Sequence, residues 1–253
     1  MGFTFSHTPQ LFGMVHILSL LVIAAWNCVF FKWAKGQNED RLLLLLKRIG
    51  TGMIIGEFLK QIFCFFYVFD RQINLWFFPW QLCSMTMYCS FCASFLNENR
   101  QNAVLVFLSS FSLFAAIVAL LLPYDMLRDQ VLLTLYSFVY HGLMITVSIA
   151  SLDILRKRKE AEFLPAVFLF LIMAVIAEMI NVISHFIFHD IHVEPNMFYI
   201  TPYYPTTQPV FHEIAVRYGI FAEVVVYLES IILVSLFIWM IEKKTVLSDR
   251  HDQ

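Results

Sequence analysis

Long apolar runs alternate with short polar segments along the whole chain. A run of about 20 apolar residues is long enough to cross the hydrocarbon layer of a bilayer as a helix. Windows of that length select seven runs, at residues 12–31, 49–69, 77–96, 103–122, 131–155, 163–187 and 221–241. The pattern predicts an all-α, polytopic membrane bundle of seven transmembrane helices, forming a single domain over residues 1–253. The first run has no basic segment before it and no small-residue cleavage site after it, so we expect a retained helix.

Composition supports a membrane environment and argues against binding to nucleic acid. Hydrophobic residues make up 60% of the chain and charged residues 14%, far from the averages of soluble domains. A water-soluble core of this size could not bury so much apolar surface. The chain has 17 basic and 19 acidic residues, so it lacks the excess positive charge that binds phosphate backbones.

The basic residues fall on alternate connections between the seven runs. Three segments carry most of them: Lys32, Lys35, Arg41, Lys47 and Arg48 in the first connection, Arg156 to Lys159 in the fifth, and Lys243, Lys244 and Arg250 in the tail. Cytoplasmic loops of membrane proteins are enriched in Lys and Arg. We therefore expect the N-terminus outside and the C-terminus in the cytoplasm.

One long connection, residues 188–212, is rich in proline and tyrosine. It holds Pro195, Pro202, Pro205 and Pro209 together with Tyr199, Tyr203 and Tyr204. Proline at this density prevents a continuous helix, and tyrosine favours the level of the lipid head groups. The segment is expected to be either an outward interfacial loop or a lid over a site that opens to the outer leaflet.

Polar side chains recur inside the apolar runs, where burial in hydrocarbon is costly. Those expected in the outer half of the bundle are His16, Glu57, Lys60, Gln81, Cys83, His141, Glu178, Asn181, His185 and Glu223. They could line a water-accessible cavity. For three of them a structural role is also open: Glu57 and Lys60 are three residues apart and can pair on one helix, and His16 can be a buried hydrogen-bonding histidine.

Cys83 and His141 form the candidate pair for covalent chemistry. All five cysteines lie in apolar runs, so a disulfide framework is not expected. A buried thiol is a poor nucleophile unless a neighbouring base takes its proton, and an imidazole can do so. Such a pair could attack a lipid ester and form a thioester. Pro79 is expected to begin the third helix, and Cys89 and Cys92, deeper in that helix, are expected to be packing residues.

Short motifs carry a resemblance to a known family. The stretches FFPWQLCSM (77–85), VYHG (139–142), INVISH (180–185) and PNMFYI (195–200) resemble the YwaF-type integral membrane family over most of the chain. The Asn of PNMFYI is Asn196. Animal relatives of that family are acyltransferases that move acyl chains from a phospholipid onto an ether lysophospholipid.

The resemblance implies roles for individual residues. Cys83 would accept the acyl chain, and His141 would act as general base and then as general acid. Gln81 and Asn181 could orient the histidine or hold the developing oxyanion. The implied partners are phospholipid and lysophospholipid in the bilayer, no metal or coenzyme is required, and the plasma membrane of a microbe is the expected location.

Two other functions remain open from the residues. A metal-dependent membrane hydrolase could use His185, His189 and His192 with Asp190, because histidines spaced by one helical turn can bind zinc. A transporter or sensor could use the intramembrane charges, although no inverted repeat supports transport. The last apolar run contains no lysine for a retinal Schiff base.

Overall fold

The computed structural model describes residues 4–188 and 195–248. The α-helices of this part are α1 (Met14–Ala34), α2 (Glu39–Phe63), α3 (Leu82–Ala93), α4 (Glu98–Val106), α5 (Ser112–Leu121), α6 (Val131–Arg158), α7 (Phe163–Ile187), α8 (Pro209–Tyr218) and α9 (Ile220–Ser248). Shorter turns are the π-helical η1 (Cys64–Val68) and η3 (Phe107–Phe111) and the 3₁₀-helical η2 (Leu75–Phe77) and η4 (Met197–Tyr199). Extended backbone pairs only in an isolated bridge between Thr4 and Gln130, so the all-α prediction is confirmed for these residues.

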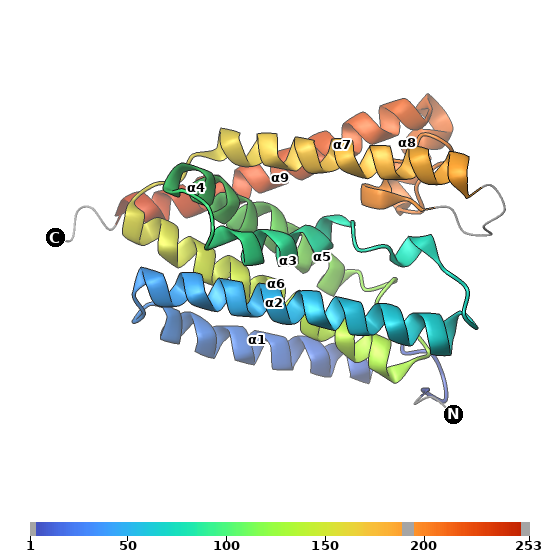
Figure 1. The fold of residues 1–253 in the computed structure, drawn as a ribbon, viewed down its shortest axis with the longest axis horizontal. Helices are drawn as coiled ribbons and strands as arrows, with labels where there is room; N and C mark the ends of the chain where they lie inside the picture. Colours follow the sequence, from blue (N-terminus) through green and yellow to red (C-terminus); the bar gives the residue numbers. More distant parts are fainter. Residues whose placement is uncertain (1–3, 189–194, 249–253) are drawn as a thin grey trace.

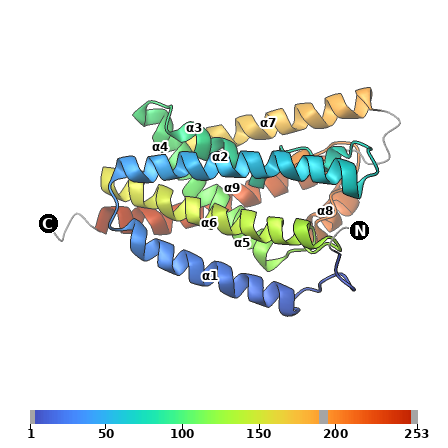
Figure 2. The ribbon, with the colours of Figure 1, turned by 60° about the horizontal axis from the view of Figure 1, so that its bottom comes forward.

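The long helices run side by side along one axis. Helices α1 and α2 form one side of the bundle, α7 and α9 form the other, and α3, α5 and α6 lie between them (Figure 1). Turning the bundle places α7 on the side opposite α1 (Figure 2). Helix α2 packs most extensively on α3, and α6 contacts α1, α2 and α5. The start of α1 and the end of α9 lie at opposite ends of the bundle (Figure 1).

Among the described residues, five helical stretches are long and apolar enough to cross a membrane. They are Met14–Ala34, Glu98–Leu121, Val131–Arg158, Phe163–Ile187 and Ile220–Lys244. The stretch Glu98–Leu121 joins α4, η3 and α5 through a π-helical turn. These stretches indicate a membrane protein. Helix α2 carries several charged residues and α3 has only 12 residues, so the count of seven crossings stays a prediction.

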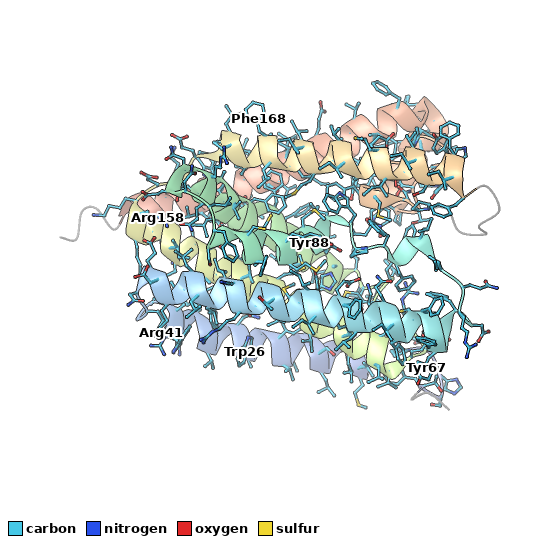
Figure 3. The ribbon with its side chains drawn as sticks, in the orientation of Figure 1. Trp26, Arg41, Tyr67, Tyr88, Arg158 and Phe168 are labelled. Carbon is cyan, nitrogen blue, oxygen red and sulfur yellow. The ribbon has the colours of Figure 1, made fainter. Side chains whose placement is uncertain are left out.

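The surface of the bundle fits a lipid environment. The face of α1 that turns away from the other helices exposes large apolar side chains such as Leu21, Val22 and Trp26, and α7 exposes Phe168 and Ile172. Trp26 and Phe168 lie on opposite sides of the bundle (Figure 3). Soluble proteins rarely expose apolar surface on this scale. Arg41 and Arg158, by contrast, lie together at the end of the bundle where α9 ends (Figure 3).

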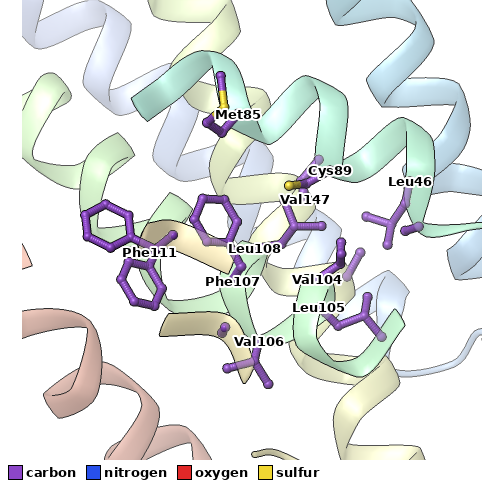
Figure 4. Close-up of a cluster of buried hydrophobic side chains, with 14 of the residues drawn as sticks. Leu46, Met85, Cys89, Val104, Leu105, Val106, Phe107, Leu108, Phe111 and Val147 are labelled. Atoms are coloured by element: carbon purple, nitrogen blue, oxygen red, sulfur yellow. The ribbon is translucent and has the colours of Figure 1, made fainter. Parts of the chain in front are cut away.

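The core joins the helices on both sides of the bundle. Side chains from α2, α3, α4, η3 and α6 meet in one buried apolar cluster, which includes Leu46, Met85, Cys89, Val104, Leu105, Val106, Phe107, Leu108, Phe111 and Val147 (Figure 4). Aromatic rings extend this cluster toward α7. The ring of Phe111 lies 5.1 Å from that of Phe170, whose ring lies 6.1 Å from that of Phe198 in η4. Phe198 therefore anchors η4 in the core.

Local sequence explains where several helices begin and end. The Asn38 side chain accepts a hydrogen bond from the Arg41 backbone N–H at 2.9 Å, and Asn97 caps α4 in the same way. Both caps satisfy N–H groups that a helix start leaves without partners, and acidic residues follow each of them. Helix α6 ends where Lys159 takes a left-handed conformation with φ of 58°.

The start of the third expected span corrects the prediction for Pro79. Helix α3 begins at Leu82, so Pro79 lies outside it. Proline disfavours helical conformation in the residue before it, and Phe78 is extended, with ψ of 133°. Gln81 is extended as well, with ψ of 160°. Pro79 thus ends the turn of η2, and the chain enters α3 only after two further residues.

Candidate functional site

Cys83 is the second residue of α3 and is partly exposed. The first turn of a helix leaves backbone N–H groups without intrahelical partners, and these groups favour negative charge nearby. Negative charge on the Cys83 sulfur would meet these N–H groups, whereas the partial burial of the residue opposes such a charge.

Three tyrosines from different elements surround Cys83. The phenol of Tyr140 on α6 donates a hydrogen bond to the Cys83 carbonyl oxygen at 3.3 Å. Gln81, two residues before Cys83, binds the Phe198 N–H beside Tyr199 of η4, and the Tyr199 ring lies 6.4 Å from that of Tyr227 on α9. The start of α3 therefore lies where α6, η4 and α9 meet.

His141 follows Tyr140 on α6. Its Nδ1 lies 2.8 Å from the Ser137 carbonyl oxygen, one turn earlier on the same helix. A carbonyl oxygen can only accept, so Nδ1 carries the proton and Nε2 keeps a free lone pair. In the described part of the chain, no hydrogen bond joins His141 to the Cys83 sulfur. The structure places the two residues on contacting helices, α3 and α6; proton transfer between them stays a prediction.

Two side-chain amides hold the loop that contains η4. Gln81 donates to the Asn196 carbonyl oxygen at 2.9 Å and accepts from the Phe198 N–H at 2.9 Å. Asn181 of α7 accepts from the Met197 N–H at 2.7 Å and donates to the Met197 carbonyl oxygen at 3.1 Å. Their amides thus hold the loop backbone, and the expected roles in orienting His141 or holding an oxyanion stay predictions.

The loop itself enters the bundle. Asn196, Met197, Phe198 and Thr201 are each at most 2% exposed, so this part of the proline-rich connection is buried inside the protein. Asn196 accepts the Thr201 N–H at 3.0 Å and thereby closes the loop. Phe198 and Tyr199 have φ of 58° and 59°, a left-handed conformation that bulky residues rarely adopt.

Tyr199 links this loop to the connection before α6. Its phenol donates to the Asp125 carboxylate at 3.0 Å. Burial raises the pKa of the Tyr199 phenol, and the neighbouring Asp125 carboxylate raises it further. Tyr199 therefore remains a protonated hydrogen-bond donor throughout the physiological pH range.

Glu57 and His16 have structural roles. Lys60 Nζ lies 2.6 Å from Glu57 Oε1, which confirms the expected pairing, and Tyr136 donates to Oε2 at 3.0 Å. His16 is fully buried; its Nδ1 accepts the Phe12 N–H at 3.0 Å, and its Nε2 lies 2.8 Å from the Leu120 carbonyl oxygen. Both ring nitrogens of His16 bind backbone groups. His16 is therefore a buried hydrogen-bonding histidine, the structural role that the sequence left open.

The remaining candidates lie along α7. Glu178 Oε2 accepts from Asn181 at 3.4 Å, and the His185 ring stacks on Tyr203 with centroids 3.6 Å apart. The other members of the proposed zinc set, His189, Asp190 and His192, lie outside the described residues. Within residues 4–188 and 195–248, no three His, Cys, Asp or Glu side chains are grouped to hold a metal.

The cysteines follow the sequence prediction in part. All five lie in the described residues as free thiols, which agrees with the absence of a disulfide framework. Cys89 is buried in the core, as expected of a packing residue. Cys92 is exposed, which corrects that expectation, because the far end of α3 turns it out of the core.

The tyrosines around Cys83 were missed at the sequence level. Tyr140 and Tyr199 lie inside two of the quoted motifs, VYHG and PNMFYI, so these motifs could have indicated both tyrosines as site residues. Comparison of the chain with protein-family models, curated proteins and solved structures finds no match. The arrangement around Cys83 is therefore interpreted from its own chemistry.

Proposed function

We propose that this protein is a membrane acyltransferase that moves a fatty acyl chain from a phospholipid to a lysophospholipid through a thioester on Cys83. Membership of the YwaF-type family and a location in the plasma membrane of a microbe are part of this proposal. The observation that carries it is the position of Cys83 in the first turn of α3, where its carbonyl oxygen accepts a hydrogen bond from Tyr140, the residue before His141 on α6.

In the first half-reaction, the Cys83 sulfur attacks the carbonyl carbon of the donor ester. The S–H proton passes to His141 Nε2, the carbon–sulfur bond forms and the ester carbon–oxygen bond breaks. His141 then gives the proton to the departing hydroxyl oxygen, so a lysophospholipid leaves. The N–H groups at the start of α3 favour the thiolate that this step requires.

The second half-reaction reverses these roles. The hydroxyl group of an acceptor lysophospholipid attacks the thioester carbonyl carbon and gives its proton to His141. The carbon–sulfur bond breaks, and the proton returns to the sulfur. The ester count is unchanged, so the reaction needs neither a coenzyme nor a metal. Both lipids can reach the site by lateral diffusion in the membrane.

Acyl transfer in proteoliposomes tests this function. The vesicles contain a phospholipid with a deuterated acyl chain and a lysophospholipid with a different head group, and mass spectrometry follows the label. We expect the wild-type protein to move the label and Cys83→Ala to reduce transfer to background. His141→Ala should lower the rate by roughly 10²- to 10⁴-fold, the contribution of a general base.

Cys92→Ala is the matched control, because Cys92 is a free thiol on the same helix but is exposed at its other end. It should transfer label at the wild-type rate. Transfer by Cys83→Ala at the wild-type rate would refute the covalent mechanism.

A further inference from the structure

Glu223 is a buried carboxylate without a hydrogen-bond partner among the described residues. It is 1% exposed, and neither carboxylate oxygen accepts a hydrogen bond there. The other buried carboxylates contrast with it. Glu57 binds Lys60 and Tyr136, Asp153 binds Lys157, and Glu242 accepts from Ser109. An ionised carboxylate in an apolar site is costly unless a cation or donors compensate it.

Glu223 points into the bundle from the first turn of α9. Residues spaced by four lie on one helical face, and Ile231 and Ser235 of this row are 3% and 0% exposed. Tyr227 lies on the same row, one turn after Glu223, and interacts with its carboxylate. The inward face of α9 thus presents a carboxylate followed by a phenol.

Aromatic rings gather around this phenol. The ring centroid of Tyr227 lies 4.9 Å from that of Phe211 on α8 and 6.4 Å from that of Tyr199. Tyr199 in turn lies 5.7 Å from Trp76 of η2. Each of these contacts is edge-to-face. Aromatic rings beside a carboxylate are the groups with which proteins bind ammonium ions, because the ring faces attract a cation that has lost its water.

We propose that Glu223 and Tyr227, with the rings of Phe211 and Tyr199, bind an alkylammonium group. The link to catalysis rests on the proposed function. The ring of Tyr227 contacts that of Tyr199, and Gln81, two residues before Cys83, binds the backbone N–H of Phe198 beside Tyr199. An ammonium head group held at Glu223 would therefore belong to a lipid whose ester can lie near the sulfur. The site then selects zwitterionic amine-bearing phospholipids over anionic ones.

Equilibrium binding in detergent, measured by native mass spectrometry, tests the inference. The protein carries Cys83→Ala, so no thioester can form and binding is independent of acyl transfer. The probes are a choline lysophospholipid, a glycerol lysophospholipid of the same chain length and choline chloride. We expect Glu223→Gln to weaken binding of the choline lipid by roughly tenfold or more and to leave the glycerol lipid unchanged.

Glu229→Gln is the matched control, since Glu229 is an exposed carboxylate on the same helix. It should leave all affinities unchanged. If binding of choline chloride also depends on Glu223, a free ammonium ion is enough to occupy the site. If only binding of the choline lipid depends on Glu223, the ligand is the ammonium head group of a lipid. Two results would overturn the inference. One is equal affinity of the protein with Glu223 intact for the choline and glycerol lysophospholipids, and the other is unchanged binding of the choline lipid by a folded Glu223→Gln protein.

The two proposals fail separately. If the label-transfer assay shows no activity with any lipid but choline-lipid binding depends on Glu223, the ammonium site stands without the acyltransferase. If transfer depends on Cys83 and head-group charge has no effect on binding, the acyltransferase stands without the ammonium site.

Discussion

Gln81 and Asn181 each use both ends of a side-chain amide on the backbone of one loop. Because the loop around η4 is buried, its backbone N–H and C=O groups need hydrogen-bond partners inside the protein. The two amides supply four of these bonds from α7 and from the residue before α3. Polar residues in apolar runs therefore serve here to hold irregular backbone, a role that spacing along the chain does not distinguish from catalysis.

Replacing Asn181 by Leu should loosen this loop. Met197 is fully buried, and the substitution removes the partner of its N–H and the shorter of the two hydrogen bonds to its C=O, the other coming from the Ile200 N–H. Each lost partner costs about 1–3 kcal/mol, so the melting temperature should fall and protease should cut within residues 195–208 more readily. Glu178→Gln is the control, because Glu178 makes only a 3.4 Å contact with Asn181. A wild-type melting temperature and proteolysis pattern for Asn181→Leu would show that the Asn181 amide does not hold the loop in place.

The sequence predicts individual local contacts of the site but not its overall composition. The i, i+3 spacing of Glu57 and Lys60 predicted their ion pair, because helical geometry fixes that distance. The environment of Cys83 depends on Tyr199 and Tyr227, which are more than 100 positions away along the chain. No local pattern specifies which helices bring such residues together.

Between the helices, α2 and α3 approach each other closely at Gly50. A Cβ atom at this position would lie 2.5 Å from the Phe91 backbone nitrogen and 2.9 Å from the Met87 carbonyl oxygen. Small residues allow such close approach of membrane helices. This contact fixes α3, and with it Cys83, against α2.

Gly50→Ala should therefore separate α2 from α3. Overpacking of this kind costs about 1–3 kcal/mol, which chemical denaturation in detergent would detect as a lower unfolding free energy. Gly52→Ala is the control, because a Cβ there meets nothing within 4 Å and alanine favours a helix by up to about 1 kcal/mol. Equal effects of the two substitutions would show that the close approach at Gly50 does not determine stability.

Elements differed in how well the apolar pattern located them. The expected run 163–187 coincides with α7, and α6 starts at Val131 as expected, because each run is bounded by polar residues. Helix α3 is much shorter than the run 77–96, since apolar composition also extends over the non-helical residues around Pro79. Helix α8 was not expected, because it begins at Pro209, inside the segment predicted to be a loop.

At the scale of the whole molecule, charge distinguishes the two ends of the bundle. At one end Arg158 pairs with Glu39 and also bonds to Gln101 and Asn102, which joins α6 to α2 and α4. Arg41 lies at this same end (Figure 3). The opposite end contains α8 and the start of α1 (Figure 1). The positive-inside rule predicts that the basic end faces the cytoplasm and that the candidate site faces outward.

Fusion reporters test this orientation. A C-terminal tag on the full chain should be protected from protease added to intact cells, whereas an N-terminal tag should be cleaved. An odd number of crossings requires this difference, and the opposite positions of the start of α1 and the end of α9 are its structural basis. Tags accessible on the same side would exclude seven crossings and would place the basic connections on both sides.

An acyl chain carried by Cys83 would change the mass of the intact protein. Wild-type protein mixed with phospholipid in the absence of an acceptor should gain the mass of one acyl chain, and neutral hydroxylamine should remove it, as it does from a thioester. Cys92→Ala should gain the same mass, and Cys83→Ala should gain none. An acyl adduct that persists in Cys83→Ala, or acyl transfer by a wild-type protein that never gains this mass, would contradict a thioester intermediate on Cys83.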